Sequence, residues 1–184
     1  MSLSPCGCYI ATCEFSGKDV NVFNVKTSKL LYSLVGHSDW IRCAEWSSDG
    51  TMIATGSYDT TVRIWNATSG KIIHTLKDHT NIVRVVAWSP DGNLLASGSE
   101  DSQVRLWNPR TGAMCRTLRF HKHYITSLKW SDDSMTLTSK TSFDKATWSI
   151  KTYKIVENQD LVSIVPQLSP YMVQGFNMNV HLIA

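Results

Sequence analysis

The chain has 184 residues, of which 42% are hydrophobic, 10% aromatic and 18% charged, and this balance excludes a disordered or collagen-like polypeptide. Its net charge of +3 comes from singly scattered cations, which excludes a polybasic nucleic-acid-binding arm. No apolar run approaches the roughly 18 residues of a membrane span, and the first residues lack the basic and apolar regions of a secretion signal. We therefore expect a cytoplasmic or nuclear protein that is not secreted and has no membrane partner.

Residues 1–36 contain short β-type runs separated by turn residues. The segment Val20–Phe23 stands in the same relation to its neighbours as Val62–Trp65 does later in the chain. This correspondence predicts the second, third and fourth strands of a sheet over residues 1–36. The first strand of that sheet has no counterpart in the sequence.

Two tandem repeats follow, over residues 37–78 and 79–120. They align without a gap, and 17 of 42 positions are identical. Each repeat has four runs rich in β-branched and aromatic residues, which are separated by turn signals such as Asp49-Gly50 and Asp91-Gly92. We expect each repeat to form one four-stranded antiparallel sheet, since a repeat of this length indicates a stacked array.

The repeat becomes weaker over residues 121–158, which keep His121, Trp130 and Trp148 but lack the Gly-Ser pair of the earlier repeats. One extra residue precedes Asp144, which predicts a remodelled second turn and an incomplete set of the repeated polar residues. Residues 159–184 are expected to form a last, incomplete unit, with its first strand at Val162–Leu168 and its fourth strand missing.

These features resemble the WD-repeat family, which is also called the Trp-Asp or G-protein-β-like repeat family. The resemblance is carried by the 42-residue spacing, the Gly36-His37 pair and the repeat ends Ile64-Trp65-Asn66 and Leu106-Trp107-Asn108, where Asn replaces the usual Asp. It implies an all-β propeller or a segment of one, with about three complete four-stranded blades and two incomplete flanking blades. It also implies a non-enzymatic scaffold that binds protein or peptide partners.

The expected blades are too few for the six to eight that propellers of this kind usually close with. Three explanations remain open: the chain is part of a longer one, two copies close one ring as a homodimer, or the two termini pair to close a small ring.

The resemblance further implies a structural hydrogen-bonded tetrad in each of the two full repeats. The expected members are His37, Thr55, Asp59 and Trp65 in one repeat and His79, Ser97, Asp101 and Trp107 in the next. Ser57 and Ser99 lie on the same strand faces, so either hydroxyl of each pair could be the member. A catalytic Ser/His/Asp cluster is the competing interpretation, but a constellation that recurs in every repeat favours architecture over a single nucleophilic site.

A partner-binding surface is expected on the loops that lead into the first strands and on the residue before each turn Asp. Aromatic and Arg side chains, which are enriched at interface hot spots, occur there. The candidates are Trp40, Arg42, Tyr58, Ile82, Arg84, Glu100, Tyr124 and Phe143.

Two other functions can be weighed against this scaffold. Leu95–Arg110 is similar to the box by which WD-repeat substrate receptors dock on adaptors of cullin-RING ubiquitin ligases, and Arg110 is its informative residue. A hydrolase would need a catalytic cluster that breaks the repeat, and none occurs. We expect no catalytic residue, no cofactor and no metal site, since no ligand spacing or phosphate-binding loop is present. Arg63 and Arg105 lie on third strands away from Arg42 and Arg84, which argues against nucleic acid as a partner.

Overall fold

A computed structural model describes residues 1–151 and 163–167, and all regular secondary structure in these ranges is β-strand. The strands form four antiparallel four-stranded sheets, each in simple meander order. The predicted all-β fold class is therefore confirmed.

The first sheet contains β1 (Ser2–Leu3), β2 (Tyr9–Cys13), β3 (Val20–Asn24) and β4 (Leu30–Leu34). The second contains β5 (Ile41–Trp46), β6 (Met52–Ser57), β7 (Val62–Asn66) and β8 (Ile72–Leu76). The third contains β9 (Val83–Trp88), β10 (Leu95–Ser99), β11 (Gln103–Trp107) and β12 (Met114–Arg119), and the fourth contains β13 (Ser127–Trp130), β14 (Thr136–Lys140), β15 (Lys145–Lys151) and β16 (Ser163–Gln167).

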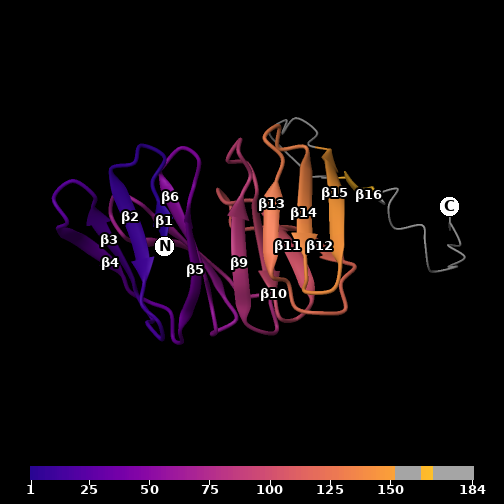
Figure 1. The fold of residues 1–184 in the computed structure, drawn as a ribbon, viewed down its shortest axis with the longest axis horizontal. Coiled ribbons are helices and arrows are strands. Elements are labelled where there is room, and N and C mark those ends of the chain that lie inside the picture. Colours follow the sequence, from indigo (N-terminus) through magenta and orange to yellow (C-terminus); the bar gives the residue numbers. More distant parts are fainter. Residues whose placement is uncertain (152–162, 168–184) are drawn as a thin grey trace, which may run out of the picture.

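The four sheets stand side by side in chain order (Figure 1). The first strands adjoin one another: β5 packs against β1 and β2, β9 against β5 and β6, and β13 against β9 and β10. The first and fourth sheets lie at opposite ends of this row (Figure 1). Within the described residues the sheets therefore form an open array, and the ring is not closed.

Each of the first three sheets has two apolar rows, which run across its strands on opposite faces. In the second sheet, Trp46, Ile53 and Trp65 are cross-strand partners, and they pack toward the first sheet. Ala54 and Ile64 are partners on the other face, and they pack toward the third sheet. Because successive residues of a strand point to opposite faces, every internal sheet is apolar on both sides, and the core consists of the three junctions.

Tight turns between the first and second strands use positive backbone φ, as the Asp-Gly pairs predict. Gly50 and Gly92 both have φ of 71°. Ser134, at the corresponding turn of the fourth sheet, adopts φ of 59°. Its hydroxyl accepts the N–H of Asp91 in the third sheet at 3.1 Å, so this less common conformation is tied to the neighbouring sheet.

The first sheet differs from the sequence expectation because its first strand is present. Ser2 pairs with Ala11, and Leu3 pairs with Ile10. The strand has only two residues, which gave no periodic pattern to detect.

The fourth sheet corrects the assignment of Val162–Leu168 as the first strand of a further unit. Ser163–Gln167 instead pairs antiparallel with β15 as the outer strand of the fourth sheet. Pro166 has no N–H to donate, so it suits an edge strand that is paired on one side only. The rest of the predicted last unit, residues 168–184, lies outside the described residues, as do residues 152–162.

Candidate functional site

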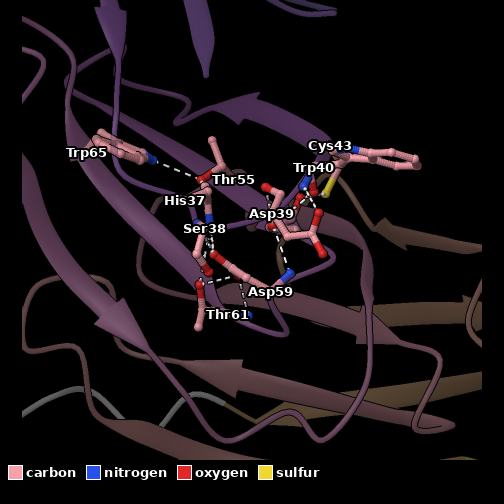
Figure 2. Close-up of polar contacts among 11 residues, drawn as sticks. His37, Ser38, Asp39, Trp40, Cys43, Thr55, Asp59, Thr61 and Trp65 are labelled. Carbon is pink, nitrogen blue, oxygen red and sulfur yellow. Dashed lines mark hydrogen bonds and ion pairs between the residues drawn. The ribbon is translucent and has the colours of Figure 1, made fainter. Parts of the chain in front are cut away.

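The first tetrad is a continuous buried hydrogen-bond chain in the second sheet (Figure 2). The indole N–H of Trp65 donates to Thr55 Oγ1 at 2.9 Å, and Thr55 Oγ1 lies 2.7 Å from His37 Nε2. His37 Nδ1 lies 2.7 Å from Asp59 Oδ2. The Asp59 carboxylate is itself held in place, because its other oxygen accepts hydrogen bonds from the hydroxyl and the N–H of Thr61. The chain requires the proton on Nδ1 of His37, which donates to the carboxylate while Nε2 accepts from the hydroxyl.

The second tetrad repeats this geometry in the third sheet and adds a cation. Trp107 donates to Ser97 Oγ at 2.8 Å, Ser97 Oγ lies 2.8 Å from His79 Nε2, and His79 Nδ1 lies 2.8 Å from Asp101 Oδ2. Arg105 is 6% exposed, and its Nη1 donates to the same carboxylate oxygen at 2.8 Å. A buried guanidinium is therefore neutralised within the tetrad.

A third tetrad is present in the fourth sheet, and the expectation that this repeat would lack one is wrong. His121 Nε2 lies 2.7 Å from Ser139 Oγ, and Trp148 Nε1 donates to that hydroxyl at 3.1 Å. Asp144 contacts His121 Nδ1 through its carboxylate. The longer turn still returns Asp144 to the histidine, because the Thr141 hydroxyl accepts the N–H of Asp144 at 3.0 Å and donates to its carboxylate at 2.7 Å.

The structure decides which hydroxyl joins each of the first two tetrads: Thr55 and Ser97 do. Ser57 Oγ instead donates to the carbonyl of Trp40 at 2.9 Å and accepts the N–H of Asp59 at 3.0 Å. Ser99 Oγ donates to the carbonyl of Asn81 at 3.0 Å and accepts the N–H of Asp101 at 3.0 Å. These serines hold the turn that carries the Asp.

The tetrad carboxylates are held in the charged form. Burial alone would raise the pKa of Asp59, but hydrogen bonds from His37 and Thr61 outweigh this effect and keep the pKa well below its usual value. The pKa of Asp101 is lowered in the same way, against its burial, by His79 and Arg105. The pKa of His79 is also lowered, because burial disfavours the imidazolium and, together with a smaller repulsion from Arg105, outweighs the stabilisation by Asp101.

The tetrads resemble a Ser/His/Asp triad in connectivity, but their hydroxyl groups are inaccessible to a substrate. Thr55, Ser97 and Ser139 are fully buried, so no substrate could reach these oxygens. Each hydroxyl already accepts an indole N–H, which holds it in place. The arrangement ties the second and third strands of each of these sheets, and the turn between them, to the loop that leads into the sheet. Among the described residues, no group of three or more His, Cys, Asp or Glu could hold a metal ion.

A separate aromatic surface lies over the first and second sheets. Trp40 is 42% exposed, and its ring meets that of Tyr58 edge-on with 5.5 Å between centroids. The Trp40 ring projects away from the tetrad (Figure 2). Trp40 and Tyr58 line a groove of about 440 Å³ together with Phe15, Arg42 and Arg84. The structure thus brings four of the predicted partner-binding residues into one concave surface.

Arg84 extends this surface onto the next two sheets. It forms an ion pair with Glu100 at 2.6 Å, and its guanidinium lies 4.7 Å from the centre of the Tyr124 ring. Ile82 is half-buried, and its carbonyl accepts the N–H of Glu100. Phe143 is 76% exposed and contacts the tilted ring of His123, a residue that the sequence did not assign to partner binding.

The remaining sequence candidates lie elsewhere. Arg110 is exposed at a turn of the third sheet, where its N–H donates to Asn108 and its carbonyl accepts from His74. Arg63 lies over the Trp65 ring, and Arg105 is buried in its tetrad, so neither guanidinium joins Arg42 and Arg84 in the groove.

Phe15 is the most exposed aromatic side chain of the groove, at 99%, and was missed by the sequence argument. The same positional rule that selected Tyr58 would have found it. Counted from the paired positions Ala11 and Ala54, Phe15 corresponds to Tyr58. The turn after Phe15 has one residue more than the turn after Tyr58. Counting backward from the third strand therefore misses Phe15, and this concealed the match.

Comparison with known proteins agrees with the tetrads and the stacked sheets. The sequence pattern of the WD domain, G-beta repeat family matches residues 28–66, 70–108 and 112–146, which is more than half of the chain. The chain belongs to this family. The first two matches each contain the last strand of one sheet and the first three strands of the next, and the third match ends two residues into β15.

The chain is also similar to periodic tryptophan protein 2 of Saccharomyces cerevisiae, with 29% identity over 63 residues. This alignment covers 34% of the chain and 7% of the yeast protein, so the chain spans a small part of that relative. No helix in the described part of this WD-repeat chain is long and apolar enough to cross a membrane.

Proposed function

We propose that this WD-repeat chain is a non-enzymatic scaffold of the cytoplasm or nucleus that binds protein partners through the groove lined by Phe15, Trp40, Arg42, Tyr58 and Arg84. WD repeats in general serve protein–protein interaction. The observation that carries the specific assignment is the contact of exposed Trp40 with half-buried Tyr58 in a concave site. Partly exposed Trp and Tyr side chains beside Arg are the composition of interface hot spots.

The groove is pre-organised, which favours binding. Tyr58 N–H donates to the carbonyl of Trp40 at 2.8 Å, so the two loops that carry the aromatic rings are joined through their main chains. Arg84 is held by Glu100 and Tyr124. Side chains fixed in this way lose little conformational freedom when a partner docks.

The charge of the groove favours a peptide with apolar side chains and a limited acidic content. Glu100 already neutralises Arg84, while exposed Arg42 and exposed Glu14 both line the groove. A peptide carboxylate or phosphate would find a cation at Arg42, and the aromatic rings would supply most of the contact area.

Partner capture by the wild-type chain and by Trp40→Ala with Tyr58→Ala tests this proposal. Proteins recovered with the wild type should be lost with the double variant, and for any purified partner the affinity should fall at least about tenfold, since hot-spot truncations cost more than about 1.4 kcal/mol. Met135→Ala removes a similarly exposed apolar side chain outside the groove and is the control. Unchanged binding by the double variant at an unchanged melting temperature would move the interaction to another surface.

A further inference from the structure

The two ends of the array differ in the chemistry of their outer faces. At every internal junction, the face turned toward the following sheet has a row of small and branched apolar residues. Its paired members are Ala11 with Val22, Ala54 with Ile64, and Ala96 with Leu106. A second row on the same face of each sheet contains a valine, which is Val20, Val62 or Val104. All nine side chains are buried in the three junction cores.

The fourth sheet has polar residues at all of the corresponding positions. Thr138 pairs with Thr147, where Ala and a branched apolar residue stand in the other sheets, and their hydroxyls lie 3.3 Å apart. Lys145 stands where the others have Val, and it is exposed. Lys129, on the neighbouring strand of the same face, is also exposed.

Lys140 shows why this face does not fit another sheet. The equivalent positions in the second and third sheets are Gly56 and Gly98, each paired with the Val of its row. A Cβ at Gly56 would lie 2.6 Å from Val83 of the next sheet, and a Cβ at Gly98 would lie 2.6 Å from Ile125. Those junctions have no room for a side chain. A lysine at this position, paired with Lys145, would place two ammonium groups inside a junction of the same kind.

The opposite end has the other half of a junction. Leu3, Ile10, Phe23 and Leu30 are cross-strand partners in one row of the first sheet. The corresponding row of the second sheet is Trp46, Ile53, Trp65 and Ile72, which packs on the first sheet. Within the described residues nothing equivalent covers the first-sheet row, since Leu3 is 55% exposed and Leu30 is 53% exposed.

We propose that the array has one docking end and one capped end. The first-sheet row Leu3–Ile10–Phe23–Leu30 takes a four-stranded sheet that presents an Ala and Val/Leu row, as at the three internal junctions. The fourth-sheet face with Thr138, Lys140, Lys145 and Thr147 is a polar cap, of the kind that keeps an outer face of a repeat array in water. The cap prevents the fourth sheet of one copy from docking on the first sheet of a second copy, so two chains do not close a ring in this way.

Removing the cap tests this proposal directly. An uncapped variant carries the residues of the third sheet: Thr138→Ala, Lys140→Gly, Lys145→Val and Thr147→Leu. Leu3→Lys and Leu30→Lys are added to it, so that its own first sheet cannot accept a partner. This sixfold variant has a docking fourth sheet and a blocked first sheet, and the wild type has the reverse. Light scattering after size exclusion should show each protein alone at its own mass and their mixture as a one-to-one complex of twice 20.6 kDa.

Two results would overturn the proposal. One is a mixture that shows no complex although both proteins unfold cooperatively. The other is a wild type that self-associates on its own and loses this association with Leu3→Lys and Leu30→Lys, which would show that the capped face docks. If the sixfold variant does not fold, Lys140→Gly with Lys145→Val, in the same blocked background, removes the two charges with fewer substitutions. The same mixture then decides the question.

Discussion

Trp88 and Glu45 join the second and third sheets, because the indole N–H of Trp88 donates to the backbone carbonyl of Glu45 at 3.1 Å. Trp130 donates to the carbonyl of Ala87 at 3.0 Å at the next junction, so the contact recurs. At the first junction the equivalent Trp46 Nε1 is buried and has no hydrogen-bond partner among the described residues. The side chain of Glu45 enters the junction as well, and burial raises its pKa to about 7.

Glu45→Gln should therefore change how stability depends on pH. The unfolded chain releases the proton near pH 4.5 and the folded chain near pH 7, so the carboxyl group makes the fold less stable as the pH rises through this window. The variant should lose this decline and melt at a higher temperature than the wild type at pH 8. Its backbone carbonyl still accepts the Trp88 bond. Melting curves from pH 4.5 to 8 check this, and parallel curves for the two proteins would contradict it.

Thr55→Ala should destabilise the protein by about 2–4 kcal/mol, because it removes the partner of two buried groups, the Trp65 indole N–H and His37 Nε2. Thr55→Ser is the matched control, since Ser97 and Ser139 fill this position in the other tetrads. It keeps the hydroxyl and should stay within about 1 kcal/mol of the wild type. Denaturant unfolding measures both. Equal losses in the two variants would mean that the methyl group stabilises the site and the hydroxyl does not.

Asp101→Ala should cost more stability than Asp144→Ala. Asp101 is almost fully buried and neutralises buried Arg105, so its loss should cost about 3–5 kcal/mol. The Asp144 side chain is 25% exposed, and its loss should cost about 1 kcal/mol. Because the pKa of Asp101 is lowered, its contribution is present above pH 4 and is lost as the pH falls. Chemical denaturation at pH 7 ranks the two variants, and the reverse order would contradict the role given to Arg105.

Gly98→Ala should destabilise the third junction by about 1–3 kcal/mol, because the added methyl group would meet Ile125. Lys140→Ala is the control at the corresponding position of the fourth sheet. There the side chain is exposed, and the change should stay within about 0.5 kcal/mol. Thermal unfolding of the two variants measures the contrast. A tolerated Gly98→Ala would show that the junction can relax.

The regular part of the molecule could be predicted from the sequence because its repeats are nearly identical. Residues 37–120 align without a gap, so one pattern indicates both the strands and the polar residues that the structure joins. The third tetrad was missed because an extra residue before Asp144 breaks the alignment. In the structure, a turn one residue longer still brings the carboxylate to His121.

The role of Val162–Leu168 could not be read from its residues. A short apolar run suits either the first strand of a new sheet or the last strand of the previous one, and only pairing with β15 distinguishes them. The choice between Thr55 and Ser57 was open for a similar reason. Both hydroxyls point to the same strand face, and which of them meets the histidine depends on where the neighbouring loop crosses.

The boundaries of the matched repeats do not coincide with the boundaries of the sheets, and this difference affects how such a chain can gain or lose length. A repeat brings the outer strand of one sheet and the first three strands of the next. Excising one whole period, residues 67–108, would therefore place β12 beside β7, in the position that β8 now occupies. The shortened polypeptide would keep every sheet four-stranded. Duplication or deletion in whole periods can thus change the number of sheets without leaving any of them short of a strand.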